Sequence, residues 1–176
     1  MCAFERSEKG MEFIMKKSMI IGIVAIVAVV LITIGGVVFT KLNKEKPSID
    51  AQTFKTTMEE KGYQLADAKS QFSEHDYIEK VYLAADSKFS YQIEFYQLVN
   101  NDYANQFYIT NMTKFENAKS SSSIETTVNG KNYSKYTLLS NGKYMVISAI
   151  NNTAIYVNVD ESHKEEVDNI LNELGY

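Results

Sequence analysis

Residues 124–159 read IETTVNGKNYSKYTLLSNGKYMVISAINNTAIYVNV, and this stretch decides the fold. It contains four runs of strand length, which are separated by Asn-Gly, a second Asn-Gly and Asn-Asn. Runs of this length between turn signals are typical of strands, and Asn-Gly is a strong signal for a two-residue type I′ hairpin. The sequence therefore predicts a four-stranded antiparallel meander over 124–128, 131–139, 143–150 and 153–159.

A helix is predicted directly after the meander. Ser162 and Glu165 have the spacing of a capping box, in which each side chain bonds the backbone N–H of the other residue. Apolar residues then recur at the three- and four-residue intervals of one helix face. They are Val167, Ile170, Leu171 and Leu174.

The region before the meander mixes both periods. Its predicted elements are a helix over 50–61, a strand over 63–68, hairpin strands over 78–85 and 90–98, and a helix over 101–118. Ser48 or Asp50 can cap the first of these helices. The whole order predicts an α+β domain, with an antiparallel sheet packed on one face by about three helices.

A charge-free run, MIIGIVAIVAVVLITIGGVVF, occupies residues 19–39. As a helix it would be about 31 Å long, enough to cross the ~30 Å hydrocarbon core of a bilayer. We therefore predict a transmembrane helix over 19–40 that follows a cytoplasmic tail over 1–18. A linker over 41–49 and an extracytoplasmic domain over 50–176 complete the chain. Translation can start at Met1, Met11 or Met15, and a start at Met15 would make the preceding residues an artefact.

The flanks of the apolar run favour an uncleaved signal anchor. A cleaved signal peptide would have a shorter apolar core, of ~7–15 residues, and a small-residue cleavage site, whereas this core ends in Val38-Phe39-Thr40. Lys16 and Lys17 directly precede the run, which favours a cytoplasmic N-terminus. The predicted location is the cell membrane, crossed once, with the C-terminal domain outside.

Composition excludes several classes of function. Residues 1–46 hold seven Lys and Arg against four Asp and Glu, while residues 47–176 hold eleven against eighteen. A domain with this acidic balance is a poor match for nucleic acid, which requires a basic surface. Cys2 is the only cysteine, so the domain has neither disulfides nor thiolate chemistry. An extracytoplasmic domain without cysteine is more typical of a bacterial surface protein than of a small eukaryotic secreted one.

No motif indicates catalysis or a cofactor. The sequence lacks the nucleophile-elbow, P-loop, dinucleotide-binding and EF-hand patterns. Glu74, His75 and Asp76 are potential metal ligands, but adjacent residues rarely converge on one ion and no second cluster accompanies them. We therefore predict no catalytic residue, no cofactor and no metal, and we do not expect an enzyme.

Tyrosines are the unusual component of the domain, which holds all twelve tyrosines of the chain and no tryptophan. Alternation along the strands places Tyr82, Tyr96, Tyr133 and Tyr156 on the face of the sheet opposite the helices, where they are candidate ligand-binding residues. The alternative is that these rings only pair across strands. The same alternation directs these residues toward the helices: Val81, Leu83, Ile93, Phe95, Leu138, Ile155, Val157 and Val159.

These features predict a membrane-anchored extracytoplasmic binding or interaction domain of a bacterial cell-surface protein. Its partners would be the lipid bilayer, through residues 19–40, and an envelope polymer or a neighbouring membrane protein, and the domain itself would be monomeric. Two alternatives remain open. One is an accessory subunit that acts through its transmembrane helix, and the other is an envelope hydrolase that uses carboxylates.

The predicted topology can be tested with protease on intact cells. Because the domain is expected outside and the apolar run inside the bilayer, protease should remove the domain and leave a short membrane stub. A domain that stays protected until the cells are lysed would reverse the orientation. A mature chain that begins near Lys41 would mean that the anchor is cleaved.

Overall fold

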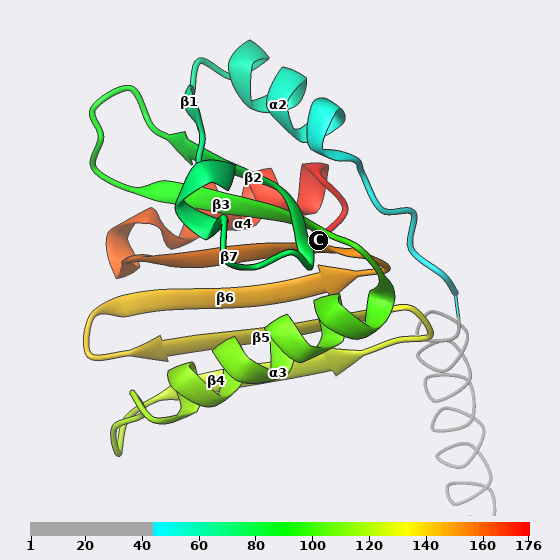
Figure 1. Ribbon diagram of the computed structural model, residues 1–176. Helices are drawn as coiled ribbons and strands as arrows, with labels where there is room; N and C mark the ends of the chain where they lie inside the picture. Colours follow the sequence, from blue (N-terminus) through cyan, green and yellow to red (C-terminus); the bar gives the residue numbers. More distant parts are fainter. Residues whose placement is uncertain (1–43) are drawn as a thin grey trace, which may run out of the picture. The chain divides into compact units, whose positions relative to one another are not determined.

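Seven strands pair in one antiparallel sheet (Figure 1). The structure is a computed structural model that describes residues 44–176. The predicted tail, the predicted transmembrane helix over 19–40 and the first linker residues lie outside the described residues. Within residues 44–176, no helix is long and apolar enough to cross a membrane.

The strand bounds follow the sequence pattern closely. The strands are β1 (Gln64–Asp67), β2 (Ile78–Ala85), β3 (Gln92–Leu98), β4 (Ile124–Asn129), β5 (Tyr133–Ser140), β6 (Lys143–Ile150) and β7 (Thr153–Asp160). Their order across the sheet is β1-β2-β3-β7-β6-β5-β4. The helices are α2 (Ala51–Glu60), the short 3₁₀ turn η1 (Lys69–Phe72), α3 (Asn101–Glu116), the 3₁₀ turn η2 (Glu161–His163) and α4 (Lys164–Glu173). The predicted α+β class and C-terminal meander are confirmed.

The two Asn-Gly pairs have different roles. Asn141 and Gly142 both have positive φ, 52° and 71°, which the predicted type I′ turn requires. The prediction of the same turn at Asn129-Gly130 is wrong, because β4 runs through Asn129 and a longer turn precedes Tyr133. Gly130 is needed there for space, since a Cβ on it would lie 2.0 Å from the Tyr133 ring.

Helices cover both faces of the sheet, so the predicted packing on one face is wrong. In Figure 1, α3 lies in front of the sheet and α4 behind it, and separate groups of buried side chains fill the two interfaces. Phe54 and Met58 of α2 share one group with Leu171 of α4, whereas Ala104 and Phe115 of α3 belong to the other. The cause is that the central strands are apolar on both sides and need two covers.

Strand β2 is out of phase with the predicted alternation. Val81 pairs with Tyr96, and Tyr82 pairs with Phe95. Because directly paired residues share a face of the sheet, Val81 lies with Tyr96 on the α3 side, while Tyr82 lies with Phe95 on the side of α2 and α4. The predicted helix-facing set is therefore divided between the two faces. Its α3-side members are Val81, Leu83 and Leu138.

Side-chain caps begin two of the three helices. An Asp50 carboxylate oxygen accepts a hydrogen bond from the Thr53 backbone N–H at 2.7 Å. At the start of α3, the Asn100 side-chain oxygen accepts one from the Tyr103 backbone N–H at 3.0 Å. The capping box predicted at Ser162 and Glu165 is wrong. The turn η2 occupies that stretch instead, and α4 begins after it with no capping side-chain bond.

Residues 45–48, which the sequence predicted as linker, are bonded to the domain, and we call them the strap. The Asn132 side chain accepts from the Lys46 backbone N–H at 2.9 Å and donates to its carbonyl at 2.8 Å. The Lys46 ammonium lies 4.7 Å from the centre of the Tyr133 ring and donates to the Gly175 carbonyl. Glu45 pairs with Lys131 at 2.7 Å. The strap is therefore part of the folded unit.

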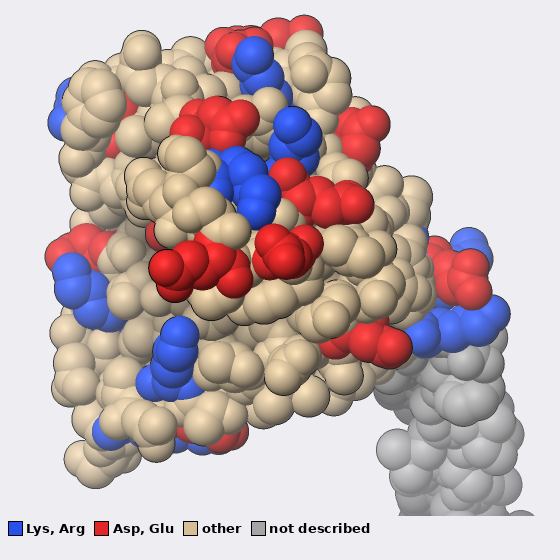
Figure 2. Space-filling model, in the orientation of Figure 1, with Lys and Arg blue, Asp and Glu red and all other residues tan. Residues whose placement is uncertain are grey.

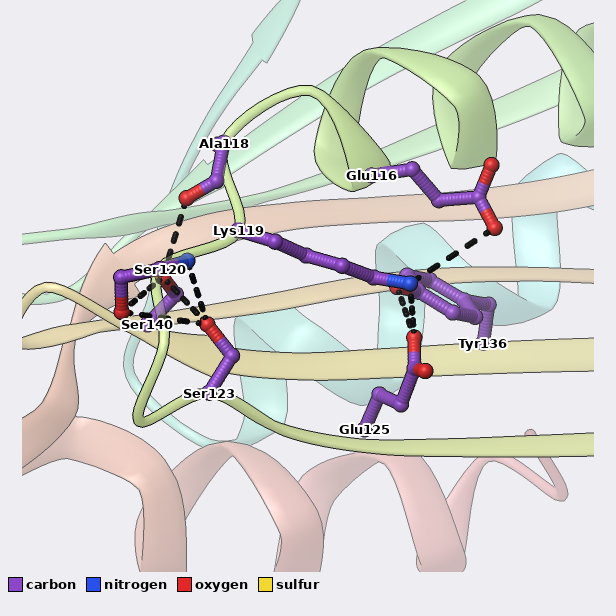
Figure 3. A network of polar contacts seen from close by, with 8 residues as sticks. All are labelled: Glu116, Ala118, Lys119, Ser120, Ser123, Glu125, Tyr136 and Ser140. Atoms are coloured by element: carbon purple, nitrogen blue, oxygen red, sulfur yellow. Dashed lines mark hydrogen bonds and ion pairs between the residues drawn. The ribbon is translucent and has the colours of Figure 1, made fainter.

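A polar network fixes the C-terminal end of α3 to the sheet (Figure 3). Lys119 forms an ion pair with Glu125 of β4, and the Tyr136 hydroxyl of β5 donates to the same carboxylate at 2.8 Å. Ser140 donates to the Ala118 carbonyl at 2.9 Å. The bonds from Lys119 and Tyr136 lower the pKa of Glu125, while burial and the Glu125 carboxylate raise the pKa of Tyr136 to about 12.

The strap can be tested with Asn132→Ala. The change removes both bonds to Lys46 and a third to Asn151, at 2.9 Å, and leaves partly buried backbone groups unpaired. We expect a loss of about 1–3 kcal/mol in the free energy of unfolding. Near-ultraviolet circular dichroism during urea unfolding of the full chain measures it, because every tyrosine lies beyond residue 47. The control Asn129→Ala, at an exposed site, should change little.

The network at α3 predicts a dependence of stability on pH. Because the pKa of Glu125 is below its ordinary value of 4.5 in the folded chain, its contribution is present above that pH and is lost as the pH falls below it. Glu125→Gln should therefore lower the melting temperature at neutral pH, and the difference from wild type should shrink in acid. The exposed control Glu60→Gln should shift the curve little at either pH. A Glu125 effect that does not vary with pH would contradict the ion-pair explanation.

Candidate functional site

A hollow of about 500 Å³ lies between α3, the segment after η1 and the sheet, and we call it the α3 pocket. Its volume falls within the ~300–1,000 Å³ typical of small-molecule sites. Its lining residues are Phe72, His75, Tyr77, Ile78, Glu94, Tyr96, Tyr103, Gln106, Phe107, Thr110, Asn111, Lys114 and Tyr156.

The floor of the α3 pocket comes from the central strands β3 and β7. Tyr96 is 5% exposed, and its hydroxyl donates to one Glu94 oxygen at 2.6 Å, while Gln92 donates to the other at 2.9 Å. Burial, followed by the bond to Glu94, raises the pKa of Tyr96 well above its usual range. The hydroxyl therefore stays protonated at neutral pH and holds the carboxylate in one orientation. Tyr156 of β7 lies beside them on the same face.

One wall of the pocket is a single face of α3. Its lining side chains recur at three- and four-residue intervals, which places them above one another along the helix. The Asn111 amide is 7% exposed and donates to the Phe107 carbonyl at 2.9 Å, and Lys114 reaches the Asn111 side-chain oxygen at 3.4 Å. Gln106 and Thr110 are exposed at the mouth.

The opposite wall consists of residues 69–78, from η1 to the start of β2, and we call it the η1 segment. Lys69 fixes it from within, because its ammonium donates to the carbonyls of Phe72, at 3.2 Å, and His75, at 3.4 Å. At its far end the Val99 backbone N–H donates to the Tyr77 carbonyl at 3.0 Å. This wall is therefore held in place although most of it is not regular structure.

Ring contacts join the floor to both walls. The Tyr96 ring meets Phe72 edge-on at 5.7 Å between centroids and lies 4.5 Å from Phe107. Tyr77 and Tyr103 stack at 5.1 Å with 16° between their planes, which links the two walls directly. Tyr103 remains 39% exposed, so part of its ring stays available to a ligand.

The structure brings two of the four predicted tyrosines together. Tyr96 and Tyr156 both line the α3 pocket, whereas Tyr82 and Tyr133 pack with the residues under α2 and α4 on the other face. Residues of the two walls were missed by sequence reasoning, which named no binding residue in the predicted helix over 101–118 or in the segment between the strands predicted over 63–68 and 78–85. The helical spacing of the α3 residues was a usable signal for one wall, but nothing in the sequence places Phe72 and Tyr77 opposite it.

A second hollow, of about 330 Å³, lies beside the β2–β3 turn and the start of α4. The hydroxyls of Tyr63 and Tyr91 bond each other there, and Tyr63 also reaches Glu166 at 3.4 Å. His163 lies 4.6 Å from the Tyr91 ring. The hydroxyls of Tyr63, Tyr91 and Ser90 and the carboxylate of Asp86 already take part in hydrogen bonds within this hollow.

The described residues hold no evident metal site. Among residues 44–176, no three His, Cys, Asp or Glu side chains gather closely enough to bind an ion. Figure 2 shows acidic and basic groups interspersed over the face that carries α3, without a large area of one sign. No protein-family model, curated protein or solved structure matches this chain.

Proposed function

We propose that this chain is a membrane-anchored, extracytoplasmic binding module of a bacterial cell surface, and that the α3 pocket is its ligand site. The observation that carries the proposal is the pocket itself, in which rings from two strands, α3 and the η1 segment meet around one oriented carboxylate. Aromatic side chains combined with precisely placed polar groups are common in ligand sites. The anchor rests on the charge-free run over 19–39.

Binding accounts for the pocket better than hydrolysis does. Glycoside hydrolysis by carboxylates needs two of them, one on each side of the scissile bond. Glu94 is the only carboxylate among the residues that line the α3 pocket. Its bonds to Tyr96 and Gln92 suit a group that positions a ligand rather than one that donates a proton.

The second hollow does not favour a hydrolase either, although Asp86 and Glu166 both line it. Asp86 accepts hydrogen bonds from the backbone N–H groups of Lys88, Ser90 and Tyr91 and from the Ser90 hydroxyl. Burial alone would raise its pKa, but these bonds lower it. A general acid needs the opposite shift.

The binding proposal can be tested on one helix. In Tyr103→Ser with Gln106→Ala, the pocket loses a ring face and an amide at its mouth. We expect purified full-length protein to lose most of its retention on isolated cell envelopes. Both positions are exposed, so the free energy of unfolding measured by tyrosine circular dichroism should fall only by the contribution of the Tyr77–Tyr103 stack, about 0.5–1.5 kcal/mol.

Two controls make this test decisive. Ile109→Ser changes a 48% exposed side chain of the same helix that does not line the pocket, and it should leave retention unchanged. Replacing residues 19–40 with an unrelated transmembrane sequence should also leave it unchanged. Equal retention by the pocket variant and wild type would contradict the proposal, and loss only after the helix swap would favour the accessory-subunit alternative.

A further inference from the structure

We propose that the α3 pocket takes a short stretch of a neutral glycan chain. The inference rests on the binding function proposed above and adds the chemical class of the ligand. Four properties of the pocket carry it: its ring faces, its remaining hydrogen-bonding groups, its balanced charge and its length.

The rings provide flat apolar surfaces with polar rims. Six aromatic side chains line the pocket, and Tyr77, Tyr103 and Tyr156 are the tyrosines that remain accessible beside the buried Tyr96. A sugar ring has the matching construction, because its C–H groups form an apolar face and its hydroxyls project at the edge. Rigid tyrosines supply such contacts at little cost in conformational entropy. The aromatic lining is Phe72, Tyr77, Tyr96, Tyr103, Phe107 and Tyr156.

The polar groups of the pocket include both donors and acceptors. Glu94 uses two of the about four acceptor positions of a carboxylate on Tyr96 and Gln92, and the others remain open. Lys114 and Gln106 supply donors at the exposed side. Hydroxyl groups donate and accept, so one sugar chain can satisfy all three of these side chains at once.

Charge argues against an ionic ligand. Glu94 and Lys114 bring opposite signs to the same pocket, and the surrounding face is mixed as well (Figure 2). Residues 47–176 are acidic overall, with eighteen Asp and Glu against eleven Lys and Arg, so a polyanion would be repelled. A neutral chain is opposed neither by the mixed charges of the pocket nor by the acidic balance of the domain.

The position and length of the pocket favour a glycan over an extended peptide. Peptides commonly add a strand to a sheet edge, where unpaired backbone groups are available. The floor here is β3 and β7, which pair with each other in the interior of the sheet, and the edges are β1 and β4. The lining of α3 from Tyr103 to Lys114 extends about 16 Å along the helix axis, which is longer than one sugar ring.

The test uses the full chain in a detergent without a sugar head group. The probes are cellotetraose, maltotetraose and tetra-N-acetylchitotetraose, with tetra-alanine as the peptide probe, and saturation-transfer NMR reports binding. We expect at least one tetrasaccharide to bind wild type and Ile109→Ser, independently of salt, because a neutral ligand is not screened. Tyr103→Ser should weaken that binding roughly tenfold through the lost ring contact.

Several results would overturn the glycan inference. One is that none of the tetrasaccharides binds, and another is that they bind Tyr103→Ser as well as wild type. Tetra-alanine binding that depends on Tyr103 would assign the pocket to peptides instead. If envelope retention still depends on Tyr103 and Gln106 in these cases, the binding function stands and only the glycan class fails. If retention is independent of both residues, the binding function itself fails.

Discussion

Strand β6 is buried along its whole length except at Lys143, and the rest of the domain depends on this constraint. Alternate side chains of a strand point to opposite faces, so continuous burial requires a cover on each side. Tyr144 and Val146 lie under α4 and its neighbours, while Met145 and Ile147 lie under α3. The sheet is therefore the middle layer of the unit, and α3 is required as the second cover.

The α3 pocket is a consequence of this two-sided arrangement. In Figure 1, α3 runs in front of the sheet and packs mainly on β6, with further contacts to β5 and β7, while the η1 segment lies over β2 on the same face. Between these two covers, the floor at β3 and β7 is closed only by large side chains. Tyr96 is buried there and Tyr156 remains half-buried, and the hollow above them is lined by rings.

Local signals in the sequence predicted nearly every element, because caps, alternation and Asn-Gly turns act over a few residues. They could not select the phase of β2, where a register irregularity between Ile78 and Lys80 breaks the alternation. Because both faces of the sheet are covered, either phase buries apolar side chains. The run from Tyr144 to Ile150 carried the correcting signal, since it is almost entirely apolar and does not alternate.

The candidate site was predicted only in part for the same reason. Tyr96 and Tyr156 were placed on a common face because the predicted phases of β3 and β7 agree with the structure. Tyr96 pairs with Ala154 and Tyr156 pairs with Glu94, so the two rings lie on the same face of the sheet. Tyr82 was assigned to that face through the wrong phase of β2. The contribution of Phe72 and Tyr77 depends on how the η1 segment folds over the sheet, which is a tertiary contact that no local pattern encodes.

The strap determines how the domain bears mechanical load. Tension applied from the N-terminal side at residue 44 meets the Glu45–Lys131 pair and the two Lys46–Asn132 bonds before it reaches α2. Because Asn132 directly precedes β5, the pull is shared with the sheet instead of peeling α2 away first. Rupture should therefore begin with these parallel bonds, and the α3 pocket, which is built on other strands, should keep its shape while they hold.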